Sequence, residues 1–94
     1  MEICVKGEVW HWRGPSPFHF IRTSPAESEE IKFLAGHLTY GWGCIPATVR
    51  IGETTFTTAL IPKDGIYLIP LKAVVRNSEN LEIGTHITAT LSFT

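Results

Sequence analysis

Apolar and polar side chains alternate along much of this chain with the period of two that is typical of β-strands. The longest such stretch covers residues 2–12 and is apolar on both faces. One face holds Ile3, Val5 and Val9, and the other holds Cys4, Trp10 and Trp12. Because both faces are apolar, we expect a strand whose second face also meets other parts of the protein.

Five further segments have strand character, namely residues 18–22, 45–51, 54–60, 66–69 and 86–93. Gly52-Glu53 separates two of them with the spacing of a two-residue hairpin turn. Lys63-Asp64-Gly65 predicts a second turn, because Asp bonds its own backbone and Gly accepts a positive φ. Six strands linked in this way predict a small, closed or partly closed β-barrel.

A helix is expected after the second strand. Ser24 is a typical N-cap, Pro25 follows at the first helical position, and Glu27 completes a capping box. The helix should run to about Ala35 and end at Gly36.

A second, shorter helix is expected over Leu71–Arg76. Pro70 lacks an amide donor, so we expect it to end the preceding strand and to begin this helix. The order strand, proline, helix, strand then occurs twice along the chain, and two such units would pack about a pseudo-twofold axis. The predicted fold class is therefore mainly β, a small double-split β-barrel with one capped α-helix and a second short helix.

Composition narrows the class of protein. The chain has 94 residues and a formal net charge of -1, so we expect residues 1–94 to form one domain without a field that attracts nucleic acid. No apolar stretch is long enough to cross a bilayer, and the start lacks the pattern of a signal peptide. Cys4 and Cys44 are expected to be two buried, unpaired thiols of a cytoplasmic protein, with a disulfide between them as the alternative.

No catalytic, phosphate-binding or dinucleotide-binding motif is present. The four histidines lack the spacing of a metal site, although His11 and His19 would meet if their strands pair. We therefore expect no catalytic residue, no metal and no cofactor.

Aromatic and basic residues are the more promising group. Rings with a few convergent cations can line a pocket for an anionic or planar ligand. The candidate ligand-binding residues are Trp12, Arg13, His19, Trp42, Lys63 and Arg76. Trp42 stands between two glycines, which favours a lid over this pocket. The alternative is that the rings fill the barrel and the cations extend from its edge.

Two resemblances bear on the fold. The run Gly65–Pro70, the short helix after it and Leu81–Ile87 look like the swapped-hairpin element of the AbrB/MazE-type DNA-binding proteins. A wider resemblance rests on Val9-Trp10-His11-Trp12-Arg13-Gly14, Gly41-Trp42-Gly43 and Thr57–Arg76. These segments are similar to the domain of unknown function 1905 family (DUF1905). That resemblance implies a double-split barrel within one chain and brings no catalytic residues with it.

We expect a non-enzymatic binding module for a small molecule or a protein partner, present as a monomer or a weak homodimer. An AbrB-like DNA-binding regulator is the alternative. It is weakened by the near-neutral charge, and by Ile66 at a position where the AbrB-type hairpin often has arginine. An enzyme of unknown class is the third hypothesis. Nucleic-acid and membrane partners are not expected.

Overall fold

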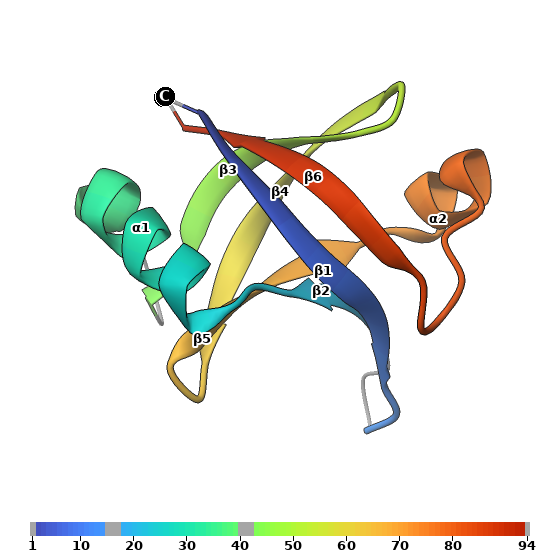
Figure 1. Cartoon of the computed structure of the whole chain (residues 1–94), viewed down its shortest axis with the longest axis horizontal. Helices are drawn as coiled ribbons and strands as arrows, with labels where there is room; N and C mark the ends of the chain where they lie inside the picture. Colours follow the sequence, from blue (N-terminus) through green and yellow to red (C-terminus); the bar gives the residue numbers. More distant parts are fainter. Residues whose placement is uncertain (1, 15–17, 40–42, 94) are drawn as a thin grey trace.

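The computed structural model describes residues 2–14, 18–39 and 43–93, and its strands form a closed barrel (Figure 1). The strands are β1 (Glu2–Trp12), β2 (Phe18–Arg22), β3 (Ile45–Ile51), β4 (Thr54–Lys63), β5 (Ile66–Leu71) and β6 (His86–Ser92). They follow the order β1-β2-β5-β4-β3-β6 around the barrel, and every recorded pairing is antiparallel. The predicted fold class is confirmed.

Two long strands are each divided between two sheets. In β1, residues 2–8 pair with β6 and residues 9–12 pair with β2. In β4, residues 54–60 pair with β3 and residues 61–63 pair with β5. Gly7 lies at the changeover in β1, where a Cβ atom would collide with the Arg22 carbonyl and the Ile21 side chain. A glycine is therefore required for β2 to approach β1 at this point.

The topology has the pseudo-twofold symmetry that the repeated order of elements predicts. Exchanging β1, β2 and β3 for β4, β5 and β6 leaves the order of strands around the barrel unchanged. Ile21 and Ile69 are paired across β2 and β5, and both are fully buried. The N-caps of the two helices, Ser24 and Lys72, each follow three residues after one of these isoleucines.

Helix α1 (Pro25–Ala35) begins as the sequence predicts. The Glu27 amide donates to the Ser24 hydroxyl over 3.1 Å, and the Ser24 amide donates to the Glu27 carboxylate over 2.8 Å. The other carboxylate oxygen accepts the Lys6 amide over 2.9 Å, which joins the helix to β1. Gly36 is the C-cap, but its φ of -59° is right-handed and the chain continues into a short 3-10 helix, η1 (Gly36–Leu38).

Helix α2 (Ala73–Glu79) begins later than expected, and the predicted range Leu71–Arg76 is wrong at both ends. Pro70 lies inside β5 and not at the helix start. It is tolerated there because β4 pairs with β5 only at residues 66–68, so no ladder bond to β4 is lost at Pro70. Figure 1 shows α1 and α2 on opposite sides of the barrel.

The inward side chains of every strand form one core, which includes Ala47, Val49 and Ile51 of β3 and Ala89 and Leu91 of β6. The expectation of two buried thiols is wrong for Cys4, which is exposed, while Cys44 is half-buried; both are unpaired. The reason is that side chains alternate between the two faces of a strand. Cys4 lies between the inward-facing Ile3 and Val5 and therefore points out of the barrel.

Candidate functional site

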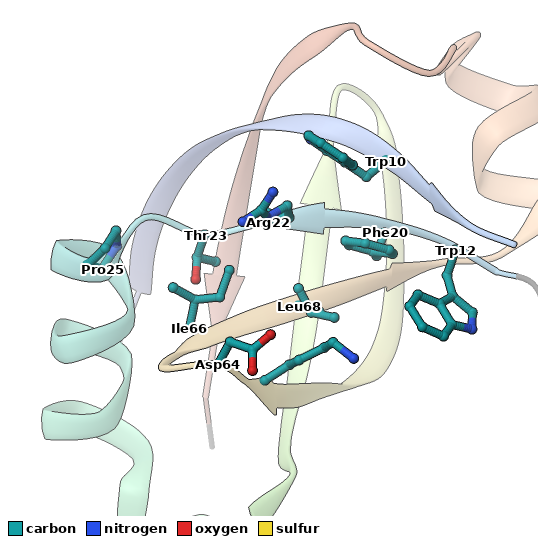
Figure 2. A pocket seen from close by; sticks show the side chains of 10 residues that line it. Trp10, Trp12, Phe20, Arg22, Thr23, Pro25, Asp64, Ile66 and Leu68 are labelled. Carbon is teal, nitrogen blue, oxygen red and sulfur yellow. The ribbon is translucent and has the colours of Figure 1, made fainter. Parts of the chain in front are cut away.

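A groove of about 500 Å³ lies on the outer wall of the barrel, over β1, β2 and β5 (Figure 2). Outward side chains of these strands line it, together with the β4–β5 turn and the start of α1. The lining residues are Trp10, Trp12, Phe20, Arg22, Thr23, Pro25, Lys63, Asp64, Ile66 and Leu68. Strand alternation alone brings most of them to this face.

The two tryptophans are the most accessible large rings of the groove. Trp10 is 42% exposed and Trp12 is 44% exposed, whereas Phe20 beside them is only 8% exposed. The register places Trp10 opposite Phe20 and Trp12 opposite Phe18. The interpretation that all the rings fill the core therefore does not fit Trp10 or Trp12, and Phe20 is buried in the lining of the groove and not in the core cluster.

A cation lies over each exposed indole. The Arg22 guanidinium carbon is 4.9 Å from the centroid of the Trp10 ring, and the Lys63 ammonium is 4.7 Å from that of Trp12. Both distances are within the range of cation–π attraction, which holds a cation against the electron-rich face of the ring. Asp64 is the one acidic residue among the described lining residues, so the lining carries two positive groups and one negative group.

Gly14 shapes one end of the groove. A Cβ atom at this position would overlap the Trp12 indole, so the ring lies directly against the Gly14 backbone. A larger residue at this position would displace the ring.

A hydrogen-bond network anchors the wall of the groove at Thr23. The Thr23 hydroxyl lies 2.6 Å from the Ser28 hydroxyl and donates to the Tyr67 carbonyl over 2.9 Å. The Tyr67 amide in turn donates to the Ser28 hydroxyl over 3.1 Å. Thr23 and Ser28 are each 3% exposed, so these bonds join β2, α1 and β5 in a dry environment. Burial raises the pKa of the Tyr67 phenol, and the nearby Glu29 carboxylate raises it further.

The six candidate residues do not form one cluster. Trp12 and Lys63 line the groove together, whereas His19 and Arg76 lie apart from it. His19 pairs with His11 across β1 and β2, as expected, and their rings stack with centroids 4.4 Å apart. Burial lowers the pKa of His19, and the charges of Arg76 and His11 lower it further.

The other two candidates are Arg13 and Trp42. Arg13 follows β1 directly and is exposed. Trp42 and its proposed role as a lid lie outside the described residues.

Eight of the lining residues are not among the candidates, including Trp10, Phe20 and Arg22. Alternation places Trp10 on the same face as Trp12, and Phe20 on the same face as Arg22. The sequence shows this alternation. It does not show that β1 pairs with β2, which is what brings the two faces together.

The described part of the chain contains no group of three or more His, Cys, Asp or Glu side chains placed to hold a metal ion. No described helix is both long enough and apolar enough to cross a bilayer. The groove instead offers flat apolar surfaces and two cations, which suit the binding of a planar or anionic group.

The fold and the groove define a small split β-barrel domain with an aromatic and basic site on its outer wall. The family described as a domain of unknown function (DUF1905) matches residues 6–91, and the chain belongs to this family. No curated protein and no solved structure gives a significant match.

Proposed function

We propose that the protein is a non-enzymatic binding module, and that its outer groove takes a planar, anionic small molecule. One observation carries this proposal: each of the two exposed indoles of the groove has a cation within 5 Å of its ring, at 4.9 Å for Arg22 and 4.7 Å for Lys63. An indole provides a stacking surface, and its neighbouring cation provides charge for an acidic group on the same ligand.

The size and lining of the groove support a small molecule. Its volume of about 500 Å³ lies within the usual range for small-molecule sites, roughly 300–1,000 Å³. Ile66 and Leu68 contribute an apolar floor from β5, and the Thr23 network fixes the adjoining wall. A site held in place in this way loses little conformational freedom when it binds.

The first experiment uses anilinonaphthalene sulfonate (ANS), a planar aromatic anion whose fluorescence rises on binding. Thioflavin T, an aromatic cation, is the comparison dye of opposite charge. We expect saturable binding of ANS and at least roughly fivefold weaker binding of thioflavin T, since one kcal/mol of charge preference is about this factor. Equal binding of the two dyes would show that the cations do not select the ligand.

The variants Trp10→Ala and Trp12→Ala test the stacking surfaces. Stacking on one aromatic side chain contributes about 1–3 kcal/mol, so each variant should weaken ANS binding roughly fivefold or more. Phe33→Ser is the matched control, because Phe33 is 87% exposed on α1 and does not line the groove. If Phe33→Ser has the same effect as the tryptophan variants, ANS reports general surface apolarity.

An AbrB-like DNA-binding role is the second candidate. It is supported by the resemblance of the β5–α2–β6 unit to the swapped-hairpin element, and it is opposed by the net charge of -1. Fluorescence anisotropy with mixed duplexes at moderate salt distinguishes the two: our proposal predicts no saturable sub-micromolar binding. A protein partner in the groove is a further alternative, and it would leave both dyes weakly bound.

We also propose a cytoplasmic location and a monomeric or weakly dimeric state. The exposed, unpaired Cys4 thiol supports a reducing compartment. Light scattering over a range of concentrations tests the oligomeric state, and a stable dimer at low concentration would contradict it.

A further inference from the structure

Two histidines meet on the opposite face of the wall that carries the groove. His11 and His19 are partners across β1 and β2, and their rings are stacked with centroids 4.4 Å apart and planes at 28°. Because side chains alternate along a strand, His11 shares a face of β1 with the buried Val9, and His19 shares a face of β2 with the buried Ile21. Both histidines are half-buried and remain open to solvent.

Helix α2 adds a guanidinium to this pair. Arg76 is half-buried, and its Nε atom is buried without a hydrogen-bond partner in the described part of the chain. His19 is the partner of Leu71 at the end of β5, directly before the N-cap of α2, so the first turns of this helix begin beside the histidine pair. The charge of Arg76 lowers the pKa of the His19 imidazole, after the larger effect of burial. The charged and titratable groups that lower the pKa of His19 are Arg76 and His11. Glu82 lines a small pocket together with Arg76, so one carboxylate lies on the α2 side of the cluster.

This cluster has a cost in the absence of a ligand. A buried N–H without a partner loses its hydration without compensation, and like charges in close proximity repel. Two imidazoles and a guanidinium together offer several N–H donors and up to three positive charges. A compact dianion with several acceptor oxygens would satisfy the donors and reverse the repulsion.

We propose that His11, His19 and Arg76 bind a phosphate group, either as inorganic phosphate or at the end of a phosphorylated small molecule. The site is separate from the groove and does not depend on the function proposed for it. Arg76 supplies a permanent charge and N–H donors, and the two imidazoles supply charge when they are protonated. Binding of the dianion therefore draws protons onto the histidines.

The test follows the imidazole signals of all four histidines by NMR as the pH is changed. Three samples are compared at equal ionic strength, with chloride, inorganic phosphate or glycerol phosphate. We expect saturating phosphate to raise the pKa of His11 and His19 by one unit or more each, which corresponds to tenfold tighter binding for each histidine that is protonated. His37 and His86 are internal controls on other elements and should not follow.

Each source of the phosphate group gives its own result. Equal shifts with both anions assign the site to the phosphate group alone, and a shift with glycerol phosphate only assigns it to a phosphorylated molecule. No shift at His11 and His19 would overturn the proposal. The same shift at all four histidines would also overturn it, because it would show a general screening effect of the ions.

Arg76→Gln should abolish the response of His11 and His19 to phosphate. Lys72→Gln is the matched control, since Lys72 is an exposed cation at the start of the same helix whose side chain makes no capping bond. If the two variants reduce the response equally, only net charge matters and the proposal fails. Should Arg76→Gln not fold, His11→Asn tests the same site, and an unchanged response of His19 to phosphate in that variant would also overturn the proposal.

Discussion

The ammonium of Lys63 lies 4.7 Å from the centroid of the Trp12 ring, although one residue ends β4 and the other ends β1. These two strands are related by the pseudo-twofold symmetry of the barrel. The contact therefore joins equivalent positions of the two halves across the sheet that holds the groove. A cation from one half and an indole from the other half together form one end of the proposed site.

Lys63→Gln should weaken ANS binding while it leaves stability nearly unchanged. The reason is that an exposed cation–π contact contributes only about 0.5–1 kcal/mol to folding, whereas the charge faces the ligand. Dye titration and thermal unfolding measure the two effects. Lys72→Gln removes the same charge outside the groove, and an equal loss of affinity in that variant would contradict a local role for Lys63.

Gly14→Ala should displace the Trp12 indole, because the new methyl group would occupy the space of the ring. We expect lower ANS affinity and altered near-ultraviolet circular dichroism, with little change in melting temperature. Gly36→Ala is the control, since its new methyl group would meet only Lys32 at 3.7 Å and its backbone is right-handed. Normal dye binding by Gly14→Ala would show that the position of Trp12 does not matter.

Ser24→Ala should lower the free energy of unfolding by about 1 kcal/mol through loss of the N-cap acceptor. Chemical denaturation measures this change as a shift of the unfolding midpoint to lower denaturant concentration. Ser78→Ala, at an exposed position within α2, provides the comparison and should cause no loss. An unchanged midpoint for Ser24→Ala would mean that the capping box does not stabilise α1.

Stability should fall as the pH drops below about 6.5. Burial, then Arg76 and His11, hold the pKa of His19 below its ordinary value of 6.5 in the folded protein. Between the lowered pKa and 6.5 the unfolded chain binds more protons than the folded chain, so acid favours unfolding; above 6.5 this contribution is constant. The measurement is denaturant unfolding across this range in a buffer free of phosphate.

His19→Gln should flatten this pH dependence, and His86→Gln should not. His86 lies on the surface, with its Nε2 atom 4.0 Å from the Glu8 carboxylate. The same pH dependence in wild type and His19→Gln would assign the effect to another group.

Local signals were sufficient for most of the fold. The alternation of residues 2–12 and the capping box at Ser24 each depend on neighbours in the chain, and both are confirmed. The start of α2 differs from the prediction because the local effect of Pro70 does not decide where the helix begins. Whether a proline fits inside a strand depends on which neighbouring strand its amide would face, and only the pairing of β5 with β2 and β4 decides that.

The candidate site was predicted less completely for the same reason. Trp12 and Lys63 were identified by residue type, but their contact depends on the order of strands around the barrel. His19 was grouped with them although it lies on the other face of β2, because sequence proximity does not separate the two faces of a wall. Arg22 could not be predicted as a site residue, because a single arginine at the end of a strand gives no signal without the register.

The most direct test of the proposed function observes the indole N–H signals of Trp10 and Trp12 by NMR during a titration with ANS. Both signals should shift together and saturate at one concentration of dye, and thioflavin T should not reproduce the shifts at that concentration. Saturable binding of ANS with unmoved signals of Trp10 and Trp12 would place the dye elsewhere and contradict the assignment of the groove as the binding site.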